Sequence, residues 1–159
     1  LPDRARAEMV LQAGELFLRL GALDAAGRAA EEALGLTGRA PGALAFRARL
    51  GAERGDWTGA LADLDAALEG RPGDPGLLVL RASAKRRLGR LVAAADDARW
   101  ARELAPEDPE AWLETGTIRA ARGDRPGARA AFLEAIRLAG EGPLARAARL
   151  RLQALEAGG

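Results

Sequence analysis

Residues 41–74 read PGALAFRARLGAERGDWTGALADLDAALEGRPGD, and residues 75–108 read PGLLVLRASAKRRLGRLVAAADDARWARELAPED. Both blocks are 34 residues long and begin with Pro-Gly, and the same period extends over most of the chain. Four columns recur at this spacing: Pro41, Pro75, Pro109 and Pro143; Gly21, Gly55, Gly89 and Gly123; Ala26, Ala60, Ala94 and Ala128; Ala33, Ala67, Ala101 and Ala135. A fixed period of this length is typical of repeat proteins, so we divide the chain into repeats at residues 7–40, 41–74, 75–108 and 109–142.

Each repeat is predicted to form two helices joined by a turn. A helical pattern of about fourteen residues leads to the mid-repeat glycine, and a second helical pattern follows it. Proline suits the first turn of a helix, where its missing N–H would have no partner. The glycine suits a left-handed C-terminal cap, and Asp56 and Asp124 directly after it are expected to cap the next helix. The alanine columns indicate close approach of two helix backbones.

This pattern resembles the tetratricopeptide repeat (TPR). Numbering each repeat from 1 to 34, the family favours a large residue at position 4, a small one at 8 and alanine at 20 and 27. Position 4 holds Val10, Leu44, Leu78 and Trp112, and position 8 holds Gly14, Ala48, Ala82 and Gly116. The chain departs from the family at position 11, which is often Tyr and here is Phe17, Gly51, Lys85 and Arg119.

The resemblance implies an all-α fold, a right-handed α-solenoid of antiparallel helix hairpins. Residues 1–142 are expected to hold the four repeats, and residues 143–159 a capping helix and tail. This last segment places Leu144, Ala148, Leu152 and Leu155 on one stripe. Such a helix would cover the last repeat, because each repeat buries its apolar face only on its neighbours.

Composition excludes several classes of function. The chain has 24 Lys plus Arg against 23 Asp plus Glu, a net charge of +1, which argues against nucleic-acid binding. It contains no Cys and no His, so we expect no metal, no cofactor and no His-based catalysis. No segment is apolar for long enough to insert directly into a membrane. The chain is therefore expected not to be an enzyme.

The composition indicates the kind of source organism but not the cellular compartment. Lys85 is the single lysine and alanine is abundant, which indicates a GC-rich and hence bacterial coding bias. Bacterial cytoplasm and periplasm both stay open, because the absence of Cys leaves the redox compartment undefined. The chain begins at Leu1, so we expect that an upstream segment has been removed.

Two structural ion pairs are predicted inside the middle hairpins. Position 7 is arginine and position 23 is aspartate in both middle repeats, and in neither outer repeat. In an antiparallel hairpin that turns near positions 15 and 16, these two positions face each other. The expected pairs are Arg47 with Asp63 and Arg81 with Asp97.

The TPR resemblance also implies a concave groove that holds a protein or peptide partner of unknown identity. It is lined by first-helix positions opposite the packed face: Glu8, Leu11, Glu15, Arg19, Phe46, Arg49, Val79, Leu80, Ser83, Arg86, Arg87, Glu110, Leu113, Glu114 and Thr117. We expect a basic centre at Arg49, Arg86 and Arg87. An apolar strip of Phe46, Val79 and Leu80 would lie beside it, with glutamates at the ends. A partner with central carboxylates and an apolar anchor would complement this groove.

TPR domains that bind chaperone tails grip a terminal carboxylate with Lys and Asn side chains at set positions. The corresponding positions here carry residues such as Leu11, Glu15 and Leu80, and the chain has no Asn. A clamp of that kind is therefore not expected.

Two alternatives to a scaffold or adaptor that binds a partner stay open. The chain could be the recognition domain of a larger enzyme, since Glu110 and Glu114 stand one helical turn apart, although such pairs are usually solvated surface. It could also be a self-assembling structural scaffold. Arg146, Arg149 and Arg151 argue for a finished, polar C-terminal end, so we expect a monomer or a weak homo-oligomer.

Overall fold

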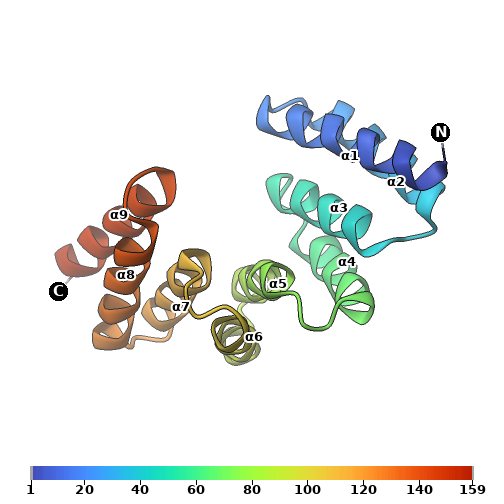
Figure 1. Cartoon of the computed structure of the whole chain (residues 1–159). Coiled ribbons are helices and arrows are strands. Elements are labelled where there is room, and N and C mark those ends of the chain that lie inside the picture. Colours follow the sequence, from blue (N-terminus) through green and yellow to red (C-terminus); the bar gives the residue numbers. More distant parts are fainter. Residues whose placement is uncertain (1, 159) are drawn as a thin grey trace. The chain divides into compact units, whose positions relative to one another are not determined.

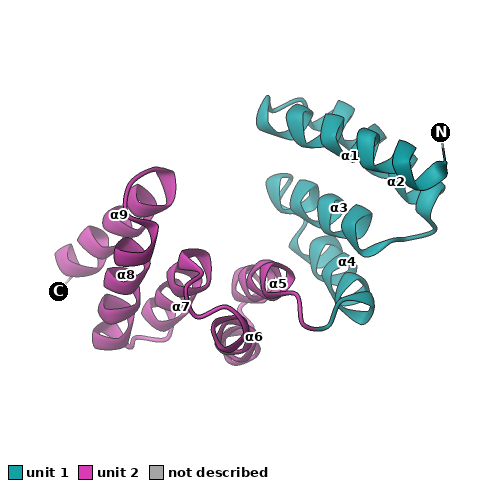
Figure 2. Ribbon diagram, viewed as in Figure 1, with its two compact units in different colours: residues 1–72 teal, residues 73–159 magenta. Residues whose placement is uncertain are grey.

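The computed structural model describes residues 2–158, and every regular element in this part of the chain is an α-helix. The helices are α1 (Asp3–Arg19), α2 (Leu23–Thr37), α3 (Pro41–Glu53), α4 (Trp57–Gly70), α5 (Pro75–Arg87), α6 (Leu91–Leu104), α7 (Pro109–Ala121), α8 (Arg125–Ala139) and α9 (Pro143–Ala157). They are divided between two compact units, unit 1 over residues 1–72 and unit 2 over residues 73–159 (Figures 1 and 2). The all-helical architecture expected from the sequence is what the structure shows.

The helix ends lie where the proline and glycine columns predict them. Pro41 begins α3, and the three later prolines of its column begin α5, α7 and α9. The four mid-repeat glycines adopt left-handed φ angles of 71° to 81°, which a side chain rarely adopts. Asp56 and Asp124 each accept a hydrogen bond from a backbone N–H of the helix they cap, at 2.9 Å. Only α1 differs, since it begins at Asp3 and is one turn longer than the repeat pattern indicates.

Within unit 1, consecutive helices pack as hairpins and each hairpin packs on the next. Helix α1 pairs with α2 and α3 with α4, while α3 also contacts both α1 and α2. The core holds Ala26, Ala29 and Ala30 of α2 against Phe46 and Leu50 of α3. Small side chains on α2 thus let two large side chains of the next hairpin sit close to its backbone.

Unit 2 repeats this arrangement and ends with a covering helix. Ala94 and Ala98 of α6 pack with Ala82 of α5 and with Ile118 of α7. Helix α9 contacts α8 and α7, and its Ala145 and Ala148 are fully buried. The segment after residue 142 therefore covers the last hairpin of unit 2, as a capping helix would.

Two glycines at position 8 accommodate the largest buried side chains. A Cβ atom at Gly14 would lie 2.7 Å from the Phe46 ring, and one at Gly116 would lie 2.5 Å from the Phe132 ring. Both phenylalanines are almost completely buried. Each ring therefore packs directly on the backbone of a neighbouring helix, at a place where even alanine would collide.

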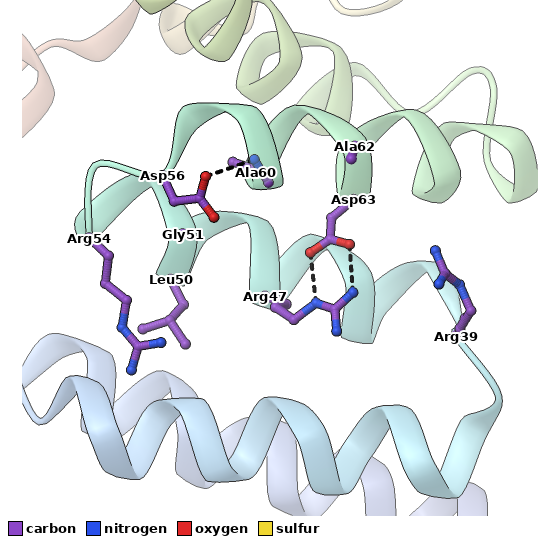
Figure 3. A pocket seen from close by; sticks show the side chains of 10 residues that line it. Arg39, Arg47, Leu50, Gly51, Arg54, Asp56, Ala60, Ala62 and Asp63 are labelled. Atoms are coloured by element: carbon purple, nitrogen blue, oxygen red, sulfur yellow. Dashed lines mark hydrogen bonds and ion pairs between the residues drawn. The ribbon is translucent and has the colours of Figure 1, made fainter.

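Both predicted ion pairs are present within their hairpins. Arg47 donates two hydrogen bonds to Asp63, each 2.8 Å long (Figure 3). It donates a third, of 3.2 Å, to Glu31 of α2. The hydrogen bonds that Arg47 donates to Asp63, which have the largest influence, and to Glu31 raise the pKa of Arg47 above its usual value. Arg81 binds Asp97 in the same bidentate way at 2.8 Å, and Lys85 Nζ lies 2.7 Å from the same carboxylate.

Gly116→Ala should destabilise the protein, because the added methyl group collides with the Phe132 ring. We expect a loss of about 2 kcal/mol in the free energy of unfolding. The matched control is Gly35→Ala in α2, where no atom lies within 4 Å of the new methyl group. That variant should gain about 0.5 to 1 kcal/mol from helix propensity. Urea denaturation of both variants measures the difference, and equal effects would show that position 8 is not sterically limited.

Asp97→Asn should cost more stability than Asp63→Asn, although the two carboxylates occupy the same repeat position. The Asp97 side chain is only 6% exposed and serves two cations, Arg81 and Lys85. The Arg47 side chain is 33% exposed and keeps Glu31 as a partner. We expect losses of about 3 and about 1 kcal/mol respectively, measured by urea denaturation. A larger loss for Asp63→Asn would contradict this ranking.

Candidate functional site

The residues predicted to bind a partner lie on the first helices of the four hairpins. Helices α1 and α3 contact each other in unit 1, and α5 and α7 contact each other in unit 2. The structure therefore presents two pairs of neighbouring first helices, which we describe one unit at a time.

Part of the predicted apolar strip is core and not surface. Phe46 is 1% exposed and packs on Gly14 and Ala29 of the preceding hairpin. Val79 is buried as well, and only Leu80 of the three stays partly accessible. The prediction was wrong for Phe46 and Val79 because it assigned half of each first helix to the groove. A first helix packs on its own hairpin and also on the other first helix of its unit, α3 on α1 and α5 on α7, so its buried arc is wider than half.

The predicted charges of the groove are largely used within the molecule. In unit 1, Arg49 of α3 forms an ion pair with Glu15 of α1. In unit 2, Arg86 of α5 lies 2.6 Å from Glu114 of α7, and both side chains are mostly buried. Each pair joins two neighbouring first helices. The sequence placed these residues on one face but did not pair them, because the pairing depends on how adjacent repeats are staggered.

This pairing corrects the expected basic centre. Arg49 and Arg86 already hold carboxylates of the same unit, so neither offers an unused charge to a partner. Glu114 is buried and tied to Arg86, which also removes it from the predicted acidic end. Reversing the charge of Arg86 would therefore break an internal contact between α5 and α7 in addition to changing any surface.

The accessible remainder in unit 2 is a surface that we call the α5–α7 face. It consists of Leu80, Ser83 and Arg87 on α5 and of Glu110, Leu113 and Thr117 on α7. In each helix these residues follow an i, i+3, i+7 spacing, which places them on one stripe. The two leucines and two hydroxyl residues are half-buried, and Arg87 and Glu110 are exposed. The face thus combines a central apolar part with charged residues of both signs.

In unit 1, all four predicted residues of α1 are at least partly accessible, and one of them, Glu15, is paired with Arg49. Leu11 is half-buried and packs against the core around Phe46. Glu8 and Arg19 are exposed, and Glu8 lies 3.4 Å from Arg4 one turn earlier. These residues belong to unit 1, whereas the α5–α7 face belongs to unit 2.

A cleft of about 500 Å³ in unit 1 lies beside the Arg47–Asp63 pair (Figure 3). Its walls include Arg39 before α3, Leu50 on α3 and Arg54 directly after α3. Arg54 donates a 2.8 Å hydrogen bond to the carbonyl oxygen of Leu23. The cleft is lined by the α3–α4 hairpin and Arg39, and its charged residues Arg47, Asp63 and Arg54 already bind groups within the unit.

Sequence reasoning missed an arginine-rich cleft of about 300 Å³ between α6 and α7. Its walls include Arg99 and Arg102 of α6 and Arg119 of α7, with Arg122 just after that helix. Burial is the main cause that lowers the pKa of Arg102, and the nearby charge of Arg119 adds to it. The Arg102 guanidinium lies over the Trp112 ring, 4.6 Å from its centroid. Asp96 pairs with Arg99 at 3.0 Å, so the charge of this cleft is partly neutralised.

The described residues offer little for other chemistries. Within residues 2–158, no group of acidic side chains is arranged to hold a metal ion. None of the helices in the same range has the length and apolar character to cross a membrane.

Comparison with known proteins identifies the repeats. The profile of the tetratricopeptide repeat matches residues 4–75 and 79–143. A search of curated proteins finds no significant match. Among solved structures, the chain is similar to TTC0263, a thermophilic TPR protein of Thermus thermophilus, with 25% identity and a TM-score of 0.84 over 96% of this chain and 82% of that one.

Two TPR domains from other proteins are also similar. The Sgt2 TPR domain of Aspergillus fumigatus has 26% identity and a TM-score of 0.69 over 74% of this chain and 78% of that one. The first TPR domain of Spaghetti (RPAP3), solved with the HSP90 peptide SRMEEVD, has 21% identity and a TM-score of 0.64, over 72% of this chain and 89% of that one. The repeat period, the helix hairpins and the profile match over most of the sequence agree: the chain belongs to the tetratricopeptide repeat family.

Proposed function

We propose that the chain is a protein-interaction module that acts by binding and not by catalysis. The family membership supports a protein or peptide as the class of ligand, and the structure of Spaghetti (RPAP3) holds a bound peptide. The α5–α7 face is the proposed binding surface. The segment it holds is an extended or helical stretch of a partner protein.

The observation that carries this proposal is the partial exposure of Leu80 and Leu113. They lie on neighbouring first helices that the Arg86–Glu114 pair holds together. Apolar side chains at a protein surface gain free energy when a partner removes them from water. Because the two paired helices are held in place before binding, the protein loses less conformational entropy when a partner binds.

The corrected charges change the expected partner. Arg86 and Arg49 are paired with Glu114 and Glu15, so they are not available to bind carboxylates in the middle of a ligand. The ligand instead needs an apolar side chain for the leucines. Glu110, which is exposed at the rim, favours a basic residue beside that anchor.

Peptides selected on the full chain from a phage-displayed random 12-residue library should test this assignment. We expect enriched peptides to share an apolar residue flanked by charges. The variant Leu80→Asp/Leu113→Asp should weaken their dissociation constants by at least about tenfold, since each aspartate removes apolar contact area. Fluorescence titration of labelled peptides measures the change.

The matched control is Leu133→Asp, which alters an exposed leucine of α8 outside the proposed face. It should leave peptide binding unchanged, and circular dichroism should show that both variants are folded. Peptides that bind the double aspartate variant as well as the original chain would place the binding surface elsewhere.

A further inference from the structure

Helix α1 carries a row of exposed apolar side chains that the binding face in unit 2 does not include. Met9 is 58% exposed, Leu16 49% and Leu20 72%, and the exposed Ala13 lies among them. At 100° per residue these four side chains fall within an arc of about 60°. We call them the α1 stripe. Phe17, at the edge of the stripe, is also partly exposed.

The same repeat positions are buried in later hairpins. Position 10 is Leu16 in the first repeat, Leu50 in the second and Ile118 in the fourth. Leu50 and Ile118 pack against alanines of the preceding hairpin. Position 3 is Met9 in the first repeat, while Ala43 and Ala111 are buried at that position. The α1 stripe therefore has the composition of a contact surface, although among the described helices α1 packs only on α2 and α3.

The charges beside the stripe indicate what covers it. Glu8 and Arg19 are both exposed, and they lie on the same side of the stripe, about 20° apart around the helix. Each is about 8 Å along the axis from the midpoint between residues 13 and 14, in opposite directions. Among the described residues, Arg19 has no ion-pair partner, and Glu8 has only the exposed Arg4.

We propose that the α1 stripe binds the α1 stripe of a second copy of the chain, in an antiparallel, two-fold symmetric helix pair. A two-fold axis that crosses the stripe between residues 13 and 14 sets Glu8 at the height of Arg19 of the other copy. Symmetry repeats this contact, so the pair gains two ion pairs along one edge. Met9 then packs between Leu16 and Leu20 of the other copy, and the small Ala13 lies near the axis, where the helices approach closest.

Other arrangements of two copies are less favourable. In a parallel pair the two-fold axis runs along the helices, so the charged sides of the two copies lie on opposite edges, and neither Glu8 nor Arg19 meets an opposite charge. A head-to-tail contact would press the stripe onto the outer side of α9, where Arg146 and Arg149 lie beside the exposed Leu150. Burying those arginines against apolar side chains would leave them without acceptors. The antiparallel pair is the arrangement in which both the apolar and the charged residues of α1 find partners.

Sedimentation equilibrium of the full chain tests the pairing. Between about 5 µM and about 500 µM, the average mass should rise from that of a monomer toward twice that value, as expected for a small interface. Leu16→Glu should abolish the rise, while Leu133→Glu, an exposed leucine of α8, should not change it. Circular dichroism should show that both variants remain helical.

Charge reversal distinguishes the antiparallel pair from any other self-contact. Glu8→Arg and Arg19→Glu should each raise the dissociation constant of the dimer about tenfold, because each creates two like-charge contacts. The double variant Glu8→Arg/Arg19→Glu should restore it, because the swapped charges meet again.

A covalent test uses the lack of cysteine in the chain. Ala13→Cys should form a disulfide-linked dimer under mild oxidation, and Ala130→Cys, at an exposed alanine of α8, should remain monomeric. A monomer at every concentration would overturn the proposal and assign the stripe to a different chain. The proposal would also be overturned if Leu16→Glu still dimerised. It would likewise be overturned if Glu8→Arg/Arg19→Glu did not recover the dimerisation that each single charge variant weakens. Neither result bears on peptide binding at the α5–α7 face.

Discussion

Close contact between neighbouring hairpins within each unit is the constraint on which the rest of this structure depends. Alanine and glycine at the contact positions let a large side chain pack on the backbone of the neighbouring helix, as Phe46 does on Gly14. A single two-helix hairpin has too little apolar area to be stable alone, so its core is completed by its neighbour. The pairing of α2 with α3, and of α6 with α7, is the structural result.

The same constraint determines where charged residues can act. Because first helices lie against each other, polar side chains between them are withdrawn from solvent and must be paired. Arg49 and Arg86 satisfy this requirement with Glu15 and Glu114. The surface left for a partner is therefore more apolar than the list of charged residues on the first helices indicates. The dependence on a neighbouring hairpin also explains why the α1 stripe is exposed, because no described helix of unit 1 other than α2 and α3 packs on α1.

Sequence reasoning was successful for features that depend on the period or on one hairpin. The prolines and glycines located the helix ends, and the facing positions 7 and 23 located the Arg47–Asp63 and Arg81–Asp97 pairs. It failed for features that depend on how one repeat meets the next. Phe46 and Glu114 both stand at position 6, and both turn toward the preceding first helix. A helical wheel of one repeat contains no information about that neighbour, so it placed them in the groove.

Native-state hydrogen exchange, measured residue by residue by NMR, tests the dependence on neighbours most directly. The chain should be studied at a concentration where it is monomeric. If each hairpin is stabilised by the one beside it, amides of α3 should exchange at least about tenfold more slowly than those of α1, and amides of α7 more slowly than those of α9. Helix α3 contacts three helices of its unit and α7 contacts four, whereas α1 and α9 contact two each. Equal protection of α1 and α3, and of α7 and α9, would contradict the account, because stability would not depend on the number of neighbouring helices.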